Sequence, residues 1–531
     1  MKSSLSKLPR AEARGIFFLA RFGYHPIGQW PKGFLARNKY IWLLLILALA
    51  FALRFYQLGQ NPPHLNWDEA SNSYNANSIL KTGKDEYGRF MPVLFKSFGD
   101  YNLALSVYPI VPSIAIFGLN QFAVRLPSAL FGVVFVLFTY LLTLKLLKNR
   151  FTALMAAFLI AISPWHLQFS RYDHEANFMQ TFILVGLTAY FYLRKKITGL
   201  ILLVLFFGLA LNSYHGAKVW VPVLLLFMTI FDRKNILKFK FKLILPALIL
   251  FAFCLPIIAN FQNSLIRGQS VGITSQKQPI STFVSGYLDH YSLNFLFNAG
   301  DTIGRHAVTG MGELYVFELP LILLGIIAVV ARKEKLPKFL LGWLLLAAIP
   351  AALATPTPHA LRAITFLPVW DIFATIGIYA IKTAKLARWT KATVFLVIGV
   401  IGLYNFITYL HLYYSHYPRQ RAVDWQDGHR QVFAYIKEHE SEYNSIAISN
   451  YYGHPYIFAL FYLGYDPALY RPQKDGQNGF GKYEFFGSSW SQTVPGKALI
   501  VTPFWQAHPP KVLKQIYTAD RDLRYIISET Q

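Results

Sequence analysis

Two short acidic segments supply carboxylates that could do chemistry in this sequence. Asp68 and Glu69 follow the first long apolar run, and Asp173 and Glu175 lie in a second polar segment. A carboxylate that is partly withdrawn from water becomes a better proton acceptor near neutral pH, so either segment could provide a general base. The alternative is structural, because an acidic pair at the start of a helix often serves as a cap.

Basic side chains are scarce in the same polar segments, which makes their positions informative. Arg171, Arg305 with the adjacent His306, and Arg362 could each bind a phosphate group, since guanidinium groups make bidentate contacts with phosphate oxygens. The alternative for each arginine is a side chain that snorkels to the membrane surface.

Histidines also gather at the ends of apolar runs. Two interpretations of these positions stay open. The histidines could line a polar cavity where imidazoles and carboxylates converge, or they could lie there because a membrane interface tolerates histidine better than hydrocarbon does. Apart from the tail of the chain and His25, the histidines in question are His64, His166, His174, His215, His290, His306, His359 and His411.

The composition indicates a protein with many membrane-spanning helices. Of the 531 residues, 54% are hydrophobic and only 15% are charged, whereas soluble domains carry about 25% charged residues. A hydrocarbon core about 30 Å thick needs roughly 20 helical residues. Eleven runs approach that length: Tyr40 to Leu58, Phe122 to Leu147, Phe151 to Gln168, Asn177 to Leu193, Thr198 to Leu211, Val219 to Phe231, Leu243 to Ala259, Phe317 to Ala331, Phe339 to Ala354, Ala363 to Ile381, and Ala392 to Leu412.

The basic residues predict the orientation of these spans. With eleven spans and the N-terminus inside, the six cytoplasmic segments contain 27 Lys and Arg residues against three acidic ones, which accounts for nearly all of the net charge of +25. Basic residues near span ends favour the cytoplasmic side. Because this charge is divided among short loops, it is a topology signal and argues against a nucleic-acid partner.

One further apolar stretch, Leu103 to Leu119, contains Pro109 and Pro112. Proline disfavours a continuous helix, so we expect this stretch to dip into the membrane as a re-entrant helix or to lie along its surface. If this stretch were counted as a span, every later segment would be assigned to the opposite side of the membrane.

The segments around the spans predict the domain organisation. We expect a basic cytoplasmic segment at 1–39, a membrane domain at 40–414 with outer loops at 57–121, 169–176, 260–316 and 355–362, and an outer α/β domain at 415–531. The single cysteine, Cys254, excludes an intramolecular disulfide framework and a cysteine-rich metal site.

Local patterns in the tail predict both strands and helices. Ser445 to Asn450, Ala498 to Phe504 and Arg524 to Ser528 are rich in β-formers and are expected to be strands. Asp427 to Glu440 and Pro510 to Thr518 are expected to be the intervening helices.

Several motifs together resemble a known family. They are similar to the bacterial members of the protein O-mannosyltransferase superfamily (family 39), which are glycosyltransferases of the GT-C type. The resemblance covers roughly Tyr40 to Ile381, and it rests on Asn66 to Ala70 (NWDEA) with Tyr74, Phe98 to Tyr101 (FGDY), Phe122 to Ser128 (FAVRLPS), the acidic second loop, and Pro358 to Arg362 (PHALR).

The resemblance implies an activity and a place for it. It implies transfer of a sugar from a polyprenyl-phosphate carrier to an extracytoplasmic acceptor, with inversion at the anomeric carbon, by an integral protein of the plasma or inner membrane. The acidic residue after the first span corresponds to Asp68, which would act on the acceptor, and the second-loop acid corresponds to Asp173. The soluble β-trefoil-type insertion of eukaryotic members is missing, so a glycan, a lipid and a protein all stay open as acceptors.

The candidate site then has a catalytic and a substrate-binding part. No metal ligand is assigned, although Asp68, Glu69 or a nearby histidine could hold a divalent cation. The candidate catalytic residues are Asp68, Glu69 and Asp173, and the candidate substrate-binding residues are Tyr74, Arg171, His174, Glu175, Arg305, His306, His359 and Arg362.

Two other classes of protein compete with an enzyme. A transporter or lipid flippase would also place polar residues in a helical bundle, but transporters concentrate them near the midplane and show two related halves, which this sequence lacks. A receptor or assembly protein would instead act through its outer tail.

Overall fold

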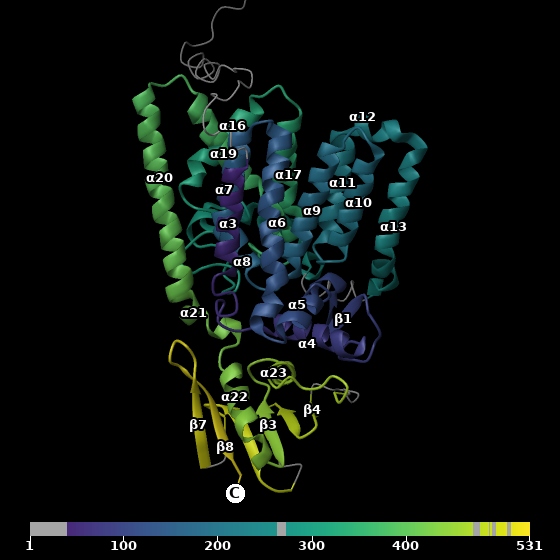
Figure 1. Ribbon diagram of the computed structural model, residues 1–531, viewed down its shortest axis with the longest axis vertical. Coiled ribbons are helices and arrows are strands. Elements are labelled where there is room, and N and C mark those ends of the chain that lie inside the picture. The colour runs from purple at the N-terminus through teal and green to yellow at the C-terminus, as the bar shows by residue number, and fades with distance from the viewer. Residues whose placement is uncertain are drawn as a thin grey trace, which may run out of the picture.

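The computed structural model describes residues 40–262, 272–470, 478–487, 489–490, 495–506 and 511–530. The chain forms a helical bundle with a smaller sheet-containing unit at one end (Figure 1). The expected basic segment at 1–39 lies outside the described residues, as does part of the third outer loop.

Each of the eleven predicted spans coincides with helical structure. Among the described residues, four helices are long and apolar enough to cross a membrane, or five if the bent pair α7 and α8 counts as one span, and the other apolar helices are shorter. The bundle helices are α3 (Ile41–Phe55), α6 (Gln121–Leu147), α7 (Arg150–Ile162), α8 (Pro164–Ser170), α9 (Glu175–Tyr192), α10 (Ile197–Leu211), α11 (Ala217–Phe231), α12 (Arg233–Ile236), η2 (Leu237–Leu243), α13 (Ile244–Ala259), α16 (Glu318–Val330), η5 (Leu336–Lys338), α17 (Phe339–Ala347), α18 (Ile349–Ala352), η6 (Arg362–Phe366), α19 (Val369–Thr383) and α20 (Arg388–His411).

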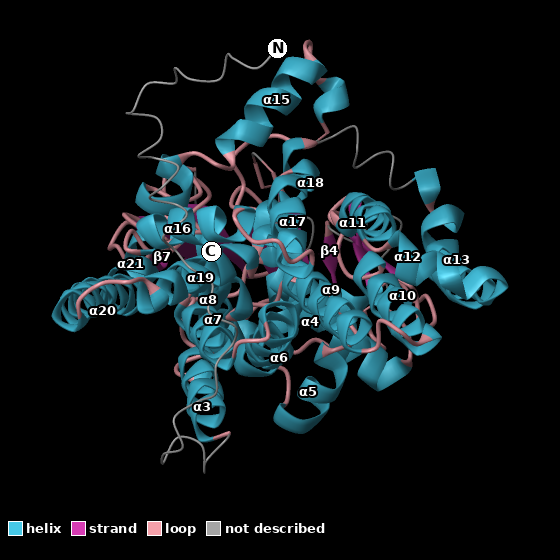
Figure 2. Cartoon of the chain, turned by 90° about the horizontal axis from the view of Figure 1, so that it is seen from above, coloured by secondary structure: helices cyan, strands magenta, loops and turns pink. Residues whose placement is uncertain are grey.

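The bundle has a packed centre and two exposed edges. Viewed along the bundle, α13 and α20 lie at opposite edges, with α8, α9 and α19 between them (Figure 2). Both edge helices expose most of their apolar side chains, as expected for helices that face lipid, whereas α19 is almost wholly buried.

Helices α16 and α19 approach each other through glycines. A Cβ atom at Gly325 would lie 1.9 Å from the carbonyl oxygen of Phe373, and one at Gly377 would lie 2.0 Å from that of Leu321. Only a residue without a side chain permits such backbone contact, which is a common way for membrane helices to pack closely.

The apolar stretch Leu103 to Leu119 contains two short helices, η1 (Ala104–Ser106) and α5. Helix α5 (Ile110–Phe117) has eight residues and is therefore about 12 Å long, too short to cross a bilayer. It ends at Gly118, whose φ of +78° lies in the left-handed region. α5 packs against α4 and α6 at the end of the bundle nearer the C-terminal sheet (Figure 1), so it adds no span.

The segment between α3 and α6 is built around α4 (Trp67–Thr82). Asn66 is its N-cap: the Asn66 side chain accepts a hydrogen bond from the backbone N–H of Glu69, and the Glu69 carboxylate accepts one from the backbone N–H of Asn66. This reciprocal capping box fixes where the helix starts. After α4 come an antiparallel hairpin of β1 (Leu94–Ser97) and β2 (Asp100–Leu103), then η1 (Ala104–Ser106).

The remaining short elements lie in the third outer loop and after α20. The first three precede α16, and the last three connect α20 to the C-terminal sheet, with α21 at the end of the bundle nearer the sheet (Figure 1). These elements are η3 (Ile273–Ser275), α15 (Pro279–Asp289), η4 (Asn294–Asn298), η7 (Leu412–His416), α21 (Tyr417–Gln420) and η8 (Val423–Trp425).

The C-terminal residues form a six-stranded mixed sheet with the order β4-β5-β3-β6-β8-β7. β3 is parallel to both β5 and β6, whereas β8 is antiparallel to β6 and β7. The elements are α22 (His429–His439), η9 (Glu440–Glu442), β3 (Ser445–Ser449), α23 (Pro455–Tyr462), β4 (Gly479–Phe480), β5 (Tyr483–Phe486), β6 (Ala498–Pro503), β7 (Lys511–Tyr517) and β8 (Leu523–Glu529).

One of the local predictions for the tail is wrong. The segment Pro510 to Thr518 was expected to be a helix, but Lys511–Tyr517 is the edge strand β7, paired with β8. Only Ile516 of β7 is buried, so the apolar face that identifies a strand is weak there, and pairing with β8 decides its conformation.

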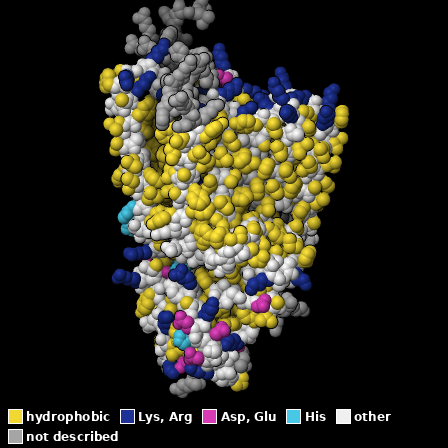
Figure 3. All heavy atoms as spheres, in the orientation of Figure 1, with side chains coloured by type: hydrophobic (Ala, Val, Ile, Leu, Met, Phe, Trp, Pro, Cys, Tyr) yellow, Lys and Arg dark blue, Asp and Glu magenta, His cyan; other side chains and the backbone are white. Residues whose placement is uncertain are grey.

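Charge is distributed unequally between the two ends of the molecule. Lys and Arg side chains gather at the end of the bundle farthest from the sheet, an apolar band follows, and charges of both signs mix around the sheet (Figure 3). This pattern agrees with basic loops on one side of a membrane and the sheet on the other.

Candidate active site

Four segments meet at the end of the bundle that faces the sheet. They are the start of α4, the turn between α8 and α9, the loop that precedes α16, and the loop that precedes η6 and α19. The electrostatic influence of Asp68 reaches both Asp173 and His174, and that of Arg305 reaches His174, so side chains from three of these segments share one small region. Asp68 is partly buried in the first turn of α4.

Glu69 is committed to a buried ion pair with Arg125 of α6. The Arg125 Nε lies 2.9 Å from Oε1 of Glu69, and both side chains are fully shielded from solvent. The guanidinium also donates to the carbonyl oxygens of Leu58, Pro62 and His64. Arg125 therefore fastens the chain between α3 and α4 to α6.

Asp173 is joined to the first acidic segment through Glu69. Its backbone N–H donates to Oε1 of Glu69 at 3.1 Å, and its Oδ2 accepts a hydrogen bond from the Asn72 side chain at 2.9 Å. Oδ1 is buried with no hydrogen-bond partner among the described residues. Burial raises the pKa of the Asp173 carboxyl well above its usual range, and neighbouring carboxylates such as Asp68 raise it further. This carboxyl is suited to donate a proton or a hydrogen bond.

His174 and Glu175 form the N-terminal end of α9. Nδ1 of His174 caps the helix by accepting from the backbone N–H of Ala176, and it lies 3.3 Å from a carboxylate oxygen of Glu175. Burial lowers the pKa of His174 to about 3, although Asp68 opposes this shift. The imidazole is therefore neutral at physiological pH.

Arg305 lies over the start of α4. Its guanidinium carbon is 5.4 Å from the centre of the Trp67 ring, and one terminal nitrogen donates to the carbonyl of Asp424 at 3.1 Å. The Arg305 carbonyl accepts from the Gln168 side chain at 2.7 Å. Arg305 is thus held over Trp67, the residue before Asp68, by contacts with the helical bundle and with the segment that leads into the C-terminal sheet.

A buried cluster of Asp301, His306 and His359 connects two of the loops. Oδ2 of Asp301 lies 2.8 Å from Nδ1 of His306 and 3.9 Å from Nδ1 of His359, and it accepts the backbone N–H of Ala360 at 2.7 Å. One potential ligand atom from each of the three residues lies within 4.8 Å of the others, so the cluster could hold a divalent cation.

The shifted pKa values leave Asp301 as the charged member of this cluster. Burial lowers the pKa of His306, and it lowers that of His359 to about 2, so both rings are neutral. Burial alone would raise the pKa of Asp301, but its hydrogen bonds and the neighbouring histidines lower it overall. Asp301 is therefore an ionised carboxylate between two neutral imidazoles.

Arg362 begins η6 directly after this cluster. Its guanidinium donates to the carbonyl of Thr355 at 2.9 Å, and its backbone N–H lies 3.4 Å from Nδ1 of His359. The residue is partly exposed. Arg362 and Arg305 are thus linked through the Asp301 cluster.

Two of the predicted substrate-binding residues are occupied by other contacts. Arg171 is almost fully buried, and its guanidinium donates to the backbone carbonyls of Leu53, Tyr56 and Asn61 and to the hydroxyl of Tyr413. Tyr74 is fully buried, and its hydroxyl donates to the carbonyl of Tyr465 in the C-terminal unit.

Sequence patterns alone do not single out the residues that attach the C-terminal unit to the candidate site. His64 Nε2 lies 2.8 Å from Oδ1 of Asp427, and the Arg125 guanidinium lies 5.7 Å from the ring centre of Trp425. The pairing of Arg125 could have been predicted from the sequence, because an arginine inside an apolar run is energetically costly unless it has a partner.

Residues 106–259 match the family model described as dolichyl-phosphate-mannose-protein mannosyltransferase. A comparison with curated proteins finds no match.

Solved structures share the fold. ArnT from Cupriavidus metallidurans in the apo state aligns with a TM-score of 0.55 and 11% identity, covering 93% of this chain and 98% of that one, and its undecaprenyl phosphate complex aligns with a TM-score of 0.53 and 10% identity, covering 92% and 98%. The oligosaccharyltransferase from Archaeoglobus fulgidus aligns in its apo form with a TM-score of 0.52 and 14% identity, covering 81% of this chain.

The two relatives differ in how completely the chain spans them. The chain spans 64% of the length of the Archaeoglobus protein, whereas it matches ArnT over nearly the full length of both. The match over residues 106–259 and the fold shared with these solved structures agree with the resemblance to GT-C glycosyltransferases that the motifs predicted.

Proposed function

We propose that the protein transfers a sugar from a polyprenyl-phosphate donor to an acceptor on the side of the membrane that carries the C-terminal sheet. The observation that supports this most directly is the convergence of Asp68 and Asp173 with Arg305, His306 and Arg362 at one end of the bundle. A polyprenyl phosphate keeps its tail in lipid and presents its phosphate-sugar bond at headgroup depth, where these groups lie.

Asp68 acts as the general base in this proposal. It takes the proton from an acceptor hydroxyl while the acceptor oxygen forms a bond to the anomeric carbon. The bond from that carbon to the phosphate oxygen breaks, and the polyprenyl phosphate leaves with the electron pair. Attack from the face opposite to the phosphate inverts the anomeric configuration.

Cations stabilise the departing phosphate. Arg305 and Arg362 each keep guanidinium nitrogens beyond those used in the hydrogen bonds to Asp424 and Thr355, so each can also bind phosphate oxygens. Burial raises the pKa of the Asp173 carboxyl well above its usual range, and in its protonated form this carboxyl can donate a hydrogen bond to the substrate.

We assign positioning roles to three of the predicted site residues. Glu69 holds Arg125 and the Asp173 backbone, Arg171 binds the end of α3, and Tyr74 fastens α4 to the C-terminal unit. These contacts keep Asp68 at its place without requiring any of the three to touch substrate.

The proposal includes a topology. Eleven spans put the basic loops in the cytoplasm, and the C-terminal sheet and the active site outside the plasma or inner membrane. Helix α5 lies along the outer surface, and residues 415–531 form the outer α/β domain. Cysteine substitution at position 68 should give labelling by an impermeant thiol reagent from the outside only, and labelling from the cytoplasm alone would contradict this orientation.

The activity is tested by incubating purified protein with radiolabelled polyprenyl-phosphate sugars and an envelope extract. We expect wild type to transfer the label and Asp68→Asn to lose at least about 100-fold of that rate, the range for a lost general base. Glu438→Gln, an exposed carboxylate on α22, is the matched control and should retain full rate. Movement of intact labelled lipid across the bilayer without sugar transfer would support a flippase instead.

A further inference from the structure

Three aromatic side chains gather at the carboxyl ends of two neighbouring parallel strands of the C-terminal sheet. Tyr451 and Tyr452 follow β3, and Trp505 follows β6. The ring centre of Tyr451 lies 4.6 Å from that of Trp505 and 5.0 Å from that of Tyr452, and both pairs meet edge to face. Tyr451 is 59% exposed and Trp505 is 54% exposed. We call these three residues the aromatic platform.

Contacts within the C-terminal unit hold the platform in place. The guanidinium carbon of Arg524, on β8, lies 4.0 Å from the centre of the Tyr452 ring, and the ring of the buried Tyr525 lies 5.2 Å from it. The indole N–H of Trp505 donates a hydrogen bond to the Tyr452 hydroxyl. The exposed rings therefore keep a fixed arrangement at the surface.

The topology of the sheet favours a binding site at this place. From β3 the chain continues to β4 and β5 on one side, whereas β6 lies on the other side of β3. In open sheets with parallel strands, ligands bind beside the carboxyl ends of the strands at such a change of direction. The platform lies on the two loops that follow the strands flanking this point.

The carboxyl ends of β3 and β6 face the helical bundle. β8 is antiparallel to β6, and it ends next to the C-terminus, which lies at the end of the sheet farthest from the bundle (Figure 1). β6, and β3 parallel to it, therefore run toward the bundle. The platform thus lies at the end of the sheet that is nearer the candidate active site.

The loop after β3 also contacts the start of α4. Gly453 has φ of +117°, and a Cβ atom there would lie 3.3 Å from the Trp67 ring, so this close approach favours glycine. The ring centre of His454 lies 5.9 Å from that of Trp67. Because Trp67 directly precedes Asp68, a single residue separates the proposed base from the loop that carries two members of the platform.

The chemistry of the platform suits a saccharide. A sugar ring presents C–H groups on its faces and hydroxyl groups around its rim, and the negative face of an aromatic ring attracts such C–H groups. A saccharide also supplies the hydroxyl from which a general base takes a proton. We propose that the platform binds a sugar ring of a glycan acceptor and so brings a glycan hydroxyl to Asp68. This proposal rests on the sugar transfer proposed above and adds the class of acceptor.

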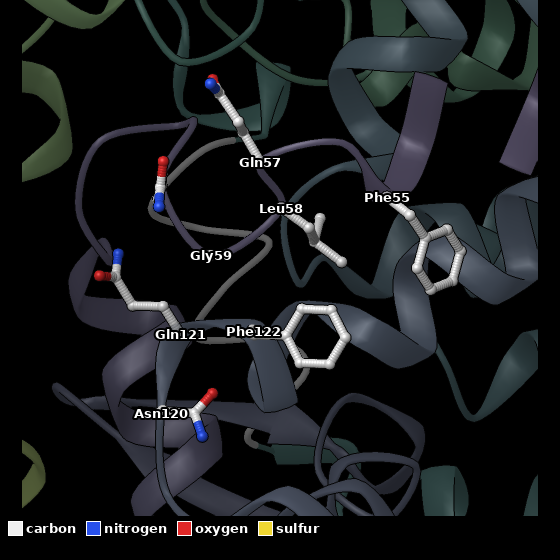
Figure 4. Close-up of a pocket in the computed structure, with 8 residues that line it drawn as sticks. Phe55, Gln57, Leu58, Gly59, Asn120, Gln121 and Phe122 are labelled. Atoms are coloured by element: carbon white, nitrogen blue, oxygen red, sulfur yellow. The ribbon is translucent and has the colours of Figure 1, made fainter. Parts of the chain in front are cut away.

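The hollow of about 440 Å³ between the end of α3 and the start of α6 suits a saccharide less well (Figure 4). The side-chain amides of Gln57 and Asn120 already donate hydrogen bonds within the protein. Its two phenylalanine rings pack against further phenylalanines. The hollow is lined by Phe55, Gln57, Leu58, Gly59, Gln60, Asn120, Gln121 and Phe122.

The first test identifies the group that receives the sugar. Purified full-length protein is incubated with a radiolabelled polyprenyl-phosphate sugar and an envelope extract, and the product is partially hydrolysed. We expect labelled disaccharides, because the transferred sugar is bonded to another sugar. Label bonded only to amino acids or to a lipid alcohol would overturn the glycan acceptor and leave the sugar transfer standing.

The second test uses substitutions in the platform. Trp505→Ala and Tyr451→Ala should each raise the half-saturating concentration of the extract about tenfold and leave the maximal rate unchanged, because the platform holds the acceptor away from the reacting atoms. Trp505→Phe keeps a ring and should restore most of the affinity. Trp389→Ala, at an exposed tryptophan where α20 begins, is the matched control. Unchanged half-saturation in both alanine variants, with wild-type unfolding temperatures, would overturn the proposal.

Two binding measurements separate the remaining outcomes. Tryptophan and tyrosine also anchor proteins at membrane surfaces, so quenching of Trp505 emission by brominated lipid in nanodiscs, measured against Trp505→Phe, would assign the platform to the bilayer and overturn the proposal. Oligosaccharides released from the extract by mild acid should give saturation-transfer NMR signals with wild type but not with Trp505→Ala. Such binding in a protein without transferase activity would refute the proposed function alone, whereas its absence would overturn the glycan site.

Discussion

Asp68 and Glu69 are adjacent carboxylates for which we predict opposite consequences of losing the negative charge. Glu69→Gln should destabilise the fold, because it leaves the buried Arg125 guanidinium without its counterion. Asp68→Asn should leave the fold nearly unchanged and abolish turnover, because Asp68 is the proposed base.

The magnitude for Glu69 follows from its contacts. Removing one partner of a fully buried ion pair costs about 3–5 kcal/mol. Glu69 also accepts backbone hydrogen bonds from Asn66 at 3.2 Å and from Asp173 at 3.1 Å, and Gln can keep only those made to its carbonyl oxygen. For Asp68, the interaction of a partly buried carboxylate with the first turn of α4 suggests a cost of about 1 kcal/mol or less.

Two assays separate these effects. Unfolding of the purified protein by increasing SDS in mixed micelles, followed by tryptophan fluorescence, reports the free energy, and release of label from a polyprenyl-phosphate sugar reports turnover. Glu438→Gln on α22 serves as the control in both. If Glu69→Gln unfolded like wild type but lost turnover, while Asp68→Asn remained active, the assignment of the two roles would be refuted.

Three further outcomes are expected. Burial raises the pKa of Glu86 to about 8, so the folded state holds a proton that the unfolded state releases near pH 4.5. The free energy of unfolding should therefore fall by up to about 5 kcal/mol as the pH rises from about 4.5 to 8. Glu86→Gln should flatten that pH dependence in SDS titrations carried out at each pH. Arg305→Ala and Arg362→Ala should each weaken donor binding about tenfold or more in equilibrium binding with a polyprenyl phosphate, and unchanged affinity in both would place the phosphate elsewhere. Asp301→Ala should cost about 3 kcal/mol of unfolding free energy, because His306 and two backbone N–H groups lose their acceptor, and a wild-type unfolding curve would contradict this.

The helical bundle was predictable from the long apolar runs. In lipid, each run can form all of its backbone hydrogen bonds within itself by becoming a helix, so its conformation does not depend on a distant partner. The edge strand β7 was not predictable in the same way. Its sequence, KVLKQIY, contains good helix formers, and one buried residue gives little alternation, so its conformation depends on β8. Local patterns could not reveal that pairing.

The convergence of the acidic and basic segments was predictable, but the contacts that each of their residues makes were not. Loops at one end of a bundle must lie near one another, so the acidic and basic segments were expected to converge. Successive residues on a helix point in directions about 100° apart, so Asp68 and Glu69 face different surroundings. Which of them meets Arg125, 56 positions further along the chain, depends on how α4 docks on α6.

The two glycines between α16 and α19 determine how far apart the loops that precede these two helices lie. Both helices start at the sheet side of the bundle, and the loops that precede them hold the Asp301 cluster and Arg362. Because Gly325 and Gly377 let the helices touch backbone to backbone, the stems of these loops have a fixed spacing that no side-chain rotation can alter. The distance between the proposed phosphate-binding groups is therefore set inside the helical bundle, by two residues that have no side chain.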